Sequence, residues 1–372
     1  MKAARWAALC LLVAGCRPDP WVAPPAIAES IEPAAGQVHA FEEAAQAREE
    51  RFLGVLSPGR AGALRTATLA RGKLGDFAQV GADLFRADAP WAGGPAPPLA
   101  PLRSAQVRAD ATRCAACHHE GGEAGAGGFA DLAFFGGDGD DVLTARRRLP
   151  RMLAGSALLS LAARDLQGAS PFGWAPGRPT ALREMVAWSA RYHLGQEPSD
   201  EEVDALTVHV ALLPPPVRAE PPAELALRTA RGAALFEQMG CASCHRPRLA
   251  VRDPRLPLSS GRVLDLSSRL SVDGQPPFVV EAFTDLQPHH MGSLRDDPGD
   301  EDLFVTAPLW GLSTRVPFLH DGRAATVEEA ILAHDGEART AREKYAAAGT
   351  DQRDLHLFLT SLSRPFALRL RR

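Results

Sequence analysis

The sequence is poor in aromatic residues, and its charges nearly balance. Aromatic side chains make up 6% of the 372 residues, and only two of them are tyrosine. The formal net charge is −4 at pH 7, so no strong positive field indicates nucleic-acid binding. Hydrophobic residues still reach 45%, which is enough to bury a core. The length suits two or three compact domains.

The sequence also lacks an apolar run long enough to cross a membrane. The run from Trp6 to Gly15 has ten residues, whereas a spanning helix needs about 20. Lys2 and Arg5 precede this run, and Val-Ala-Gly-Cys closes it at Cys16. This arrangement is typical of a bacterial lipoprotein signal at residues 1–15, with Cys16 lipidated; a plain secretory signal is the alternative. We therefore expect a protein that is lipid-anchored on the periplasmic side of the cell envelope, at the outer membrane.

Cysteine is scarce, and its placement is informative. Of the six cysteines, Cys10 lies in the signal and Cys16 is the expected lipidation site. The other four form two Cys-x-x-Cys pairs, each followed directly by His, so none is left for a structural disulfide. This spacing is that of covalent haem attachment, in which two thiols bond the porphyrin and the histidine binds iron. The motifs are Cys114-Ala-Ala-Cys117-His118 and Cys241-Ala-Ser-Cys244-His245.

Two other kinds of site use cysteine pairs. A four-cysteine zinc site does not explain why a histidine follows each pair. A redox-active Cys-x-x-Cys is unlikely to occur twice with that histidine by chance. The sequence therefore predicts two covalently bound haem c groups, with His118 and His245 as iron ligands.

Helical patterns recur in both halves of the chain, at 152–163, 181–194, 199–213, 223–239, 326–334 and 351–362, whereas residues 246–300 read mostly as loop. Each half has the order helix, haem motif, long loops, closing helices. The sequence predicts a mainly α fold of two cytochrome c-like haem domains with long irregular loops. We expect a signal peptide at 1–15, a flexible tether at 16–37, an N-terminal haem domain at 38–213, a proline-rich linker at 214–222 and a C-terminal haem domain at 223–372.

Five segments outside the haem motifs carry a family resemblance. They are Gly81-Ala-Asp-Leu-Phe85, Phe172-Gly-Trp174, Arg231-Gly-Ala-Ala-Leu-Phe236, His289-His-Met-Gly292 and the run from Thr306 to Ala338. Over roughly residues 81–362 the chain resembles the bacterial di-haem cytochrome c peroxidase superfamily, closest to its di-haem oxidoreductase family. The resemblance implies one haem that stores an electron and one open haem that reduces hydrogen peroxide. Relatives use such haems to oxidise protein side chains or to cleave polymers with oxygen.

The resemblance also implies a second ligand for the C-terminal haem. In the family it lies fourteen residues after the histidine of a Phe-x-His-x-Gly motif, which here places it at His334, after His320. Together with His245 it would close both faces of the iron, as suits electron transfer. The alternative is that His334 is a surface residue at a helix C-terminus, where histidine is favoured. His320 would support the catalytic pocket.

The N-terminal haem lacks such a ligand. No histidine occurs between His119 and His193, so this iron is expected to be open. By resemblance, Trp174 lies between the two haems. Glu184 stands near the position of a family glutamine and His193 near that of an acidic residue, which departs from the family pattern. His193 is either an acid–base group or a sixth iron ligand, and the sequence leaves both open.

The resemblance further implies a calcium ion between the domains, bound by backbone carbonyls near Arg315 and Pro317. Such ligands leave no side-chain pattern, so the sequence does not decide whether the ion is present.

Together these observations predict a periplasmic, peroxidase-like di-haem oxidoreductase. The expected partners are a small electron-donor protein or a quinol-linked donor, hydrogen peroxide or another small oxidant, and a membrane reached by the lipid anchor. Electrons would pass from the donor through the C-terminal haem to the open N-terminal haem. The alternatives are a non-enzymatic electron-transfer cytochrome, and an oxygenase or protein-modifying oxidase on the same scaffold.

Overall fold

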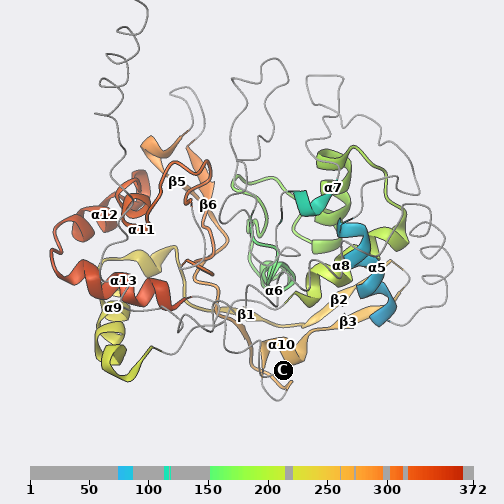
Figure 1. Cartoon of the computed structure of the whole chain (residues 1–372), viewed down its shortest axis with the longest axis horizontal. Coiled ribbons are helices and arrows are strands. Elements are labelled where there is room, and N and C mark those ends of the chain that lie inside the picture. Colours follow the sequence, from blue (N-terminus) through green and yellow to red (C-terminus); the bar gives the residue numbers. More distant parts are fainter. Residues whose placement is uncertain are drawn as a thin grey trace, which may run out of the picture.

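The computed structural model describes residues 74–86, 113–116, 118, 151–213, 221–259, 261–271, 274–295, 302–312 and 317–362. The signal segment with Cys16, the tether, Cys117 and Arg315 lie outside these residues. The described residues form two lobes that lie side by side (Figure 1). Among them, no helix is both long and apolar enough to cross a membrane.

Helices build most of each lobe. The N-terminal lobe contains α5 (Leu74–Arg86), η1 (Cys114–Ala116), α6 (Ser156–Ala163), α7 (Leu182–Leu194) and α8 (Asp200–Leu212). The C-terminal lobe contains η3 (Ala223–Leu225), α9 (Ala226–Gln238), η4 (Cys241–Ser243), α11 (Val327–Leu332), η6 (Gly336–Ala338), α12 (Arg339–Ala346) and α13 (Asp351–Ser361). The expected mainly helical character is confirmed, although α12 was not predicted.

Local signals set several helix boundaries. The hydroxyl of Thr326 accepts a hydrogen bond from Glu329 N at 3.0 Å, and the Glu329 carboxylate in turn bonds the backbone at Thr326, which forms a capping box at the start of α11. The predicted helix at 152–163 begins only at Ser156. Gly155 before it has φ of +85°, a conformation that favours glycine, and a Cβ there would lie 2.3 Å from the Trp310 ring.

Residues 246–300 were predicted to be mostly loop, and this expectation missed several short strands. They are β1 (Leu249–Val251), β2 (Arg255–Pro257), β3 (Val263–Asp265), β4 (Phe278–Val280), β5 (Pro288–His290) and, just beyond, β6 (Leu303–Val305). They pair antiparallel as β1–β4, β2–β3 and β5–β6. Between them lie α10 (Ser267–Leu270) and η5 (Gly292–Leu294). Strands of three residues are too short to show the alternating pattern by which a strand is read from sequence.

Both lobes are built on the same helix crossing. A Cβ at Gly81 of α5 would lie 2.0 Å from Ala205 O of α8, and a Cβ at Gly232 of α9 would lie 1.9 Å from Asp354 O of α13. In each pair only a glycine permits so close an approach of the two backbones.

The aromatic contacts repeat as well. Four residues after each glycine comes a phenylalanine: Phe85 packs on His209 with ring centres 5.2 Å apart, and Phe236 packs on Phe358 at 5.4 Å. The sequence segments Gly81-Ala-Asp-Leu-Phe85 and Gly232-Ala-Ala-Leu-Phe236 thus occupy equivalent places in the two lobes.

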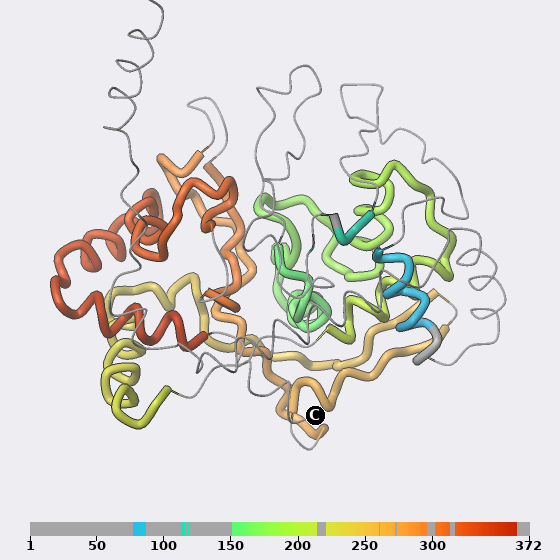
Figure 2. Tube along the Cα trace, in the orientation of Figure 1, coloured from blue at the N-terminus to red at the C-terminus, as the bar shows by residue number. Residues whose placement is uncertain are grey.

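The two hydrophobic cores do not correspond to the first and second halves of the chain. The first core joins α5 to α8 with side chains from beyond residue 221, among them Leu256, Leu264 and Val280. Figure 2 shows this later segment running beneath the N-terminal lobe. The second core gathers residues of α9, α12 and α13 around the fully buried Tyr345. Residues after the expected linker at 214–222 therefore contribute to both cores. The domain boundary itself stays a prediction.

Candidate haem sites

The two Cys-x-x-Cys-His motifs begin with the same backbone turn. Each starts with one turn of 3₁₀ helix, η1 or η4, and then the histidine N–H bonds back to the first cysteine carbonyl. The bond from His118 N to Cys114 O is 3.0 Å, and that from His245 N to Cys241 O is also 3.0 Å. Cys114 packs against the first core and Cys241 against the second. Each lobe therefore presents one motif from its own core.

In the C-terminal motif, hydrogen bonding orients His245 as a metal ligand. Its Nδ1–H donates to the carbonyl of Phe283 at 3.1 Å, which leaves Nε2 as the nitrogen with a free lone pair. Burial, helped by the neighbouring His334, lowers the pKa of His245 to about 4. The imidazole is therefore neutral near pH 7, and the neutral form is the one that binds metals.

His334 faces His245 from just beyond the end of α11. Its Nδ1 donates to the carbonyl of Ala330 at 2.6 Å, and burial lowers its pKa. The ring centres of His245 and His334 lie 6.4 Å apart. Imidazole nitrogens bind transition metals at about 2.0 Å, so two imidazoles on opposite faces of one ion have ring centres roughly 6 Å apart. The pair therefore fits a haem iron held between them.

The thiols of this motif are suited to a covalent link more than to a thiolate role. Burial raises the pKa of Cys241 to about 11, and burial also raises that of Cys244. Disulfide exchange uses the thiolate, which burial of these thiols disfavours. A pair of thiols beside two imidazoles whose ring centres lie 6.4 Å apart fits covalently attached haem.

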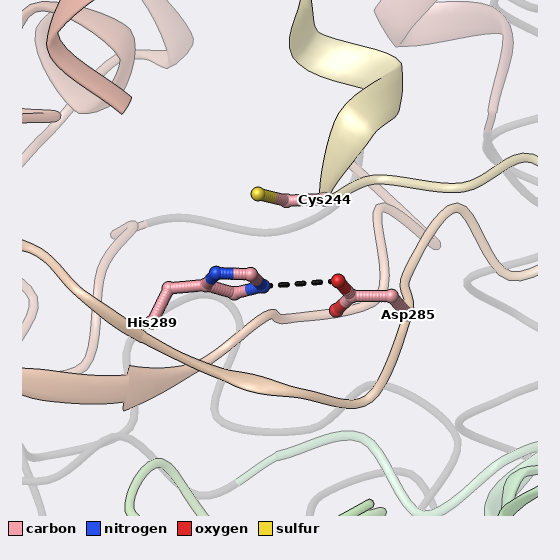
Figure 3. A group of neighbouring side chains, drawn as sticks. All are labelled: Cys244, Asp285 and His289. Carbon is pink, nitrogen blue, oxygen red and sulfur yellow. Dashed lines mark hydrogen bonds and ion pairs between the residues drawn. The ribbon is translucent and has the colours of Figure 1, made fainter. Parts of the chain in front are cut away.

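A polar cluster borders this site (Figure 3). Atoms of Cys244, Asp285 and His289 lie within 4.8 Å of one another, close enough to be considered for a metal ion. His289 Nε2 is 2.9 Å from Asp285 Oδ2, and its Nδ1 is 2.9 Å from Glu337 Oε2. Burial opposes a charge on His289, but the bonds to Glu337 and Asp285 outweigh it and raise the pKa of His289.

This cluster is a poor metal site for two reasons. Both ring nitrogens of His289 already bond carboxylate oxygens at 2.9 Å, so neither has a lone pair directed at a metal. Cys244 is also committed to the haem if the motif is loaded, and it then has no thiolate to offer. The sequence prediction missed Asp285 and Glu337, although His289 belongs to one of the resembling segments. Glu337 likewise lies in the resembling run from Thr306 to Ala338, but no spacing pattern connects the three residues.

Trp174 is held by contacts with a distant segment of the chain. Its carbonyl accepts a hydrogen bond from Val305 N of β6 at 2.8 Å. The Arg151 guanidinium lies 4.4 Å from the centre of the indole ring, and Arg151 Nη2 donates to Val305 O at 3.2 Å. The half-buried indole is thus fixed between Arg151, which lies before α6, and strand β6.

The structure separates Glu184 from His193. Both lie on α7, nine residues apart, which is about 13 Å along a helix axis. Glu184 is exposed in the first turn, whereas His193 is half-buried in the last. The His193 ring meets Trp188 and Tyr192 edge-on, with ring centres 5.5 and 4.8 Å away. The two residues therefore do not act together on one small substrate.

His320 is buried, with 1% of its surface exposed, and its ring stacks on Phe304 of β6 at 4.2 Å. Pro317 is half-buried at the start of a described segment, and Arg315 lies outside the described residues. The calcium site therefore stays a prediction.

Comparison with known proteins relates the second half of the chain to one family. Residues 184–362 match the family model described as "Di-haem oxidoreductase, putative peroxidase". This range contains the second haem motif and His334, and it begins after the first motif. A search of curated proteins gives no significant match.

Two solved structures resemble the chain at low identity. One is a hydrazine synthase of Kuenenia stuttgartiensis, studied under xenon pressure, with 17% identity and a TM-score of 0.44 over 77% of this chain and 87% of that one. The other is a MauG-like protein associated with microbial copper homeostasis, with 17% identity and a TM-score of 0.40 over 78% of this chain and 89% of that one.

Proposed function

Because residues 184–362 match the model of the di-haem oxidoreductase family, we propose that this protein is a peroxidase with two covalently bound haems. On this proposal an external donor would reduce the C-terminal haem, and electrons would pass by Trp174 to an open N-terminal haem that would reduce hydrogen peroxide. The observation that supports this best is the repeated unit of the two lobes. Each has a glycine-mediated helix crossing and a Cys-x-x-Cys-His turn that packs on its own core.

The C-terminal motif supplies the electron-transfer site. Cys241 and Cys244 would attach the porphyrin, while His245 and His334 would bind the iron. A haem closed in this way exchanges single electrons and has no position for a substrate. The carbonyls of Phe283 and Ala330 hold the two imidazoles in the tautomer that binds metal.

The N-terminal motif supplies the reactive site. Cys114 and Cys117 would attach the second porphyrin, and His118 would be its iron ligand. A haem with one open face binds peroxide and supports cleavage of its O–O bond. We assign the acid–base role to His193, because it is half-buried, whereas Glu184 is exposed to bulk water. Glu184 remains the second candidate.

The remaining groups support transfer between the two sites. Trp174 is fixed by Arg151 and by strand β6, so its indole has a defined place for carrying electrons between the haems. His320, stacked on Phe304 of the same strand, steadies the pocket. A calcium ion bound by carbonyls near Pro317 would hold the surrounding loop.

The cellular setting is proposed from the sequence. The signal and Cys16 favour a lipid anchor on the periplasmic side, at the outer membrane, where haem c proteins are assembled after export. A small donor protein or a quinol-linked donor would supply the electrons. Replacing Cys16 with Ser should release the protein from membranes, and unchanged membrane retention would count against the anchor.

The function is tested on protein produced in a host that assembles haem c. Mass spectrometry should show two added haems, with one lost in Cys114→Ala and one in Cys241→Ala. The reduced protein should bind carbon monoxide at one haem, and it should consume peroxide with a reduced donor. Loading of one haem or none would refute the central claim. Two loaded haems that bind no carbon monoxide would identify an electron carrier, and oxygen-dependent products would identify an oxygenase or protein-modifying oxidase.

A further inference from the structure

The two axial histidines of the C-terminal site are held by different parts of the chain. His245 is oriented by the carbonyl of Phe283, two residues before the buried Asp285. His334 follows α11 and leads into η6, where Glu337 lies three residues further on. The segment near Asp285 and the segment from His334 to Glu337 are far apart in the chain, since 48 or more residues separate them. A contact between them must therefore keep the segment that supports His245 (the proximal segment) and the segment that carries His334 (the distal segment) at a constant separation.

His289 joins these two segments. Its Nε2 donates to Asp285 Oδ2 at 2.9 Å on the proximal side, and its Nδ1 donates to Glu337 Oε2 at 2.9 Å on the distal side. Only 19% of the side chain is exposed. Because both ring nitrogens bond carboxylates, turning the ring would break two charge-assisted hydrogen bonds at once. The imidazole therefore holds Asp285 and Glu337 at a fixed separation.

Backbone contacts lock the distal end of this bridge. His290 N donates to the second Glu337 oxygen, Oε1, at 2.8 Å. A Cβ at Gly336 would lie 2.2 Å from His290 O, and a Cβ at Gly292 would lie 2.9 Å from Gly336 N. The segment around His290 and the segment after His334 are thus in direct backbone contact, with no space for either to slide.

Asp335 adds a second fastening beside His334. Its Oδ2 accepts a bond from Ser293 N at 3.3 Å, and its Oδ1 accepts one from Arg339 Nε at 2.9 Å. Asp335, which directly follows His334, is therefore anchored to the segment of β5 and η5 that carries His289. Movement of His334 away from its position would require the bonds of Asp335 to Ser293 and to Arg339 to break.

We propose that the Asp285–His289–Glu337 bridge is a positioning device that holds His334 at the distance from His245 at which both bind one iron. The inference rests on the proposed function, because it takes His245 and His334 as the two ligands. The bridge acts through the segments that carry these histidines and does not bind the iron. Without it, the segment from His334 to Glu337 keeps its backbone contacts with His290 and Gly292 but loses its side-chain link to Asp285, so His334 would be held less firmly.

The experiment uses the fully haem-loaded protein and two variants, His289→Gln and Glu337→Gln. Both variants keep side-chain size but lose a charge. His290→Gln is the matched control, since that neighbouring imidazole is 67% exposed and pairs with Asp302. The readouts are the high-spin fraction of the ferric C-terminal haem and carbon monoxide binding to it when reduced. Peroxide turnover is not needed, so the result does not depend on the N-terminal haem.

We expect the C-terminal haem of the wild type and of His290→Gln to be low-spin when ferric and not to bind carbon monoxide when reduced. In both bridge variants the balance between bound and dissociated His334 should shift toward dissociation by roughly tenfold, as loss of one charge-assisted hydrogen bond implies. In a His334→Ala background, Glu337→Gln should cause no further change at this haem. That combination separates an effect on the ligand from general unfolding.

Three results would overturn the inference. Bridge variants that match a closed wild type, with both haems attached, would refute the bridge alone. A wild-type C-terminal haem that already binds carbon monoxide would refute the His334 assignment and the bridge together. A stoichiometric metal ion in the haem-loaded wild type that is lost in His289→Gln would show that the cluster binds metal instead.

Discussion

Gly232 and Asp354 bring the backbones of α9 and α13 into direct contact, since a Cβ on the glycine would lie 1.9 Å from the Asp354 carbonyl oxygen. The crossing is further fastened by Arg228, whose Nε donates to Asp354 Oδ1 at 2.7 Å. Cys241 follows α9 within three residues, so this crossing also sets where the second haem motif begins.

Replacing Gly232 with Ala should destabilise the protein. In an isolated helix this change favours folding by about 1 kcal/mol, but here the new methyl group meets a backbone oxygen that cannot yield. We expect a net loss of about 1–3 kcal/mol, the usual cost of overpacking. Urea denaturation followed by circular dichroism measures it, and Gly81→Ala should have the same sign in the other lobe.

Ala234→Gly is the control on the same helix, because Ala234 is exposed. It should cost about 1 kcal/mol through helix propensity alone. A Gly232→Ala protein as stable as the wild type would show that the two helices do not approach this closely.

Replacing His334 with Ala should convert only the C-terminal haem from low spin to high spin. The reason is that the ring that faces His245 at 6.4 Å is removed, which leaves one coordination position open. Visible and electron paramagnetic resonance spectra of the ferric protein measure the change, and the N-terminal haem should keep its wild-type signal. His290→Ala removes a mostly exposed imidazole nearby and should leave both spectra unaltered. A His334→Ala spectrum like that of the wild type would disprove the assignment.

The buried pair of Tyr345 and His356 should make stability depend on acid. Tyr345 donates its hydroxyl to His356 Nε2 at 2.7 Å, and burial lowers the pKa of His356 from 6.5 to about 4. The unfolded chain therefore takes up the proton at a higher pH than the folded one. Stability from this group is complete above about pH 6.5 and is lost as pH falls toward 4.

Over that interval the slope should be about 1.4 kcal/mol per pH unit, or roughly 3 kcal/mol in all. His356→Gln keeps an acceptor for Tyr345 but does not titrate, so its stability should fall less steeply between pH 6.5 and 4.5. Thermal unfolding across this range measures the difference. Parallel curves for wild type and variant would exclude His356 as a source of the acid sensitivity.

His193→Ala should slow peroxide turnover by at least about 100-fold, since a positioned acid–base group contributes about 10²–10⁴-fold. Both haems should remain attached and the C-terminal spectrum should not change. Stopped-flow mixing with peroxide measures the rate, and Glu184→Gln, at the other end of α7, should have a much smaller effect.

A different outcome at His193 would assign it another role. If His193→Ala creates a new high-spin haem and speeds cyanide binding, then His193 is itself an iron ligand. The N-terminal haem would then be closed in the resting protein and would need to open before it could react with peroxide.

Much of this protein was determined by short stretches of sequence. The two Cys-x-x-Cys-His motifs, the capping residue Thr326 and the helical patterns of α7, α8 and α13 are all contained within a few helical turns. Helix formation depends on neighbours three or four residues away, so these elements could be predicted without a fold. The fourteen-residue offset from His320 to His334 likewise belongs to one continuous motif.

Only the tertiary structure decided how those pieces meet. The bridge from Asp285 through His289 to Glu337 joins residues up to 52 positions apart, and no local pattern indicates such a contact. The three-residue strands exist because partners such as Leu249 and Val280 pair although β2, β3 and α10 lie between them in the chain. Leu256 and Leu264 belong to the first core although they follow the second haem motif in the chain. Sequence determines what each segment can form locally, whereas burial and pairing between distant segments decide which side chains come together.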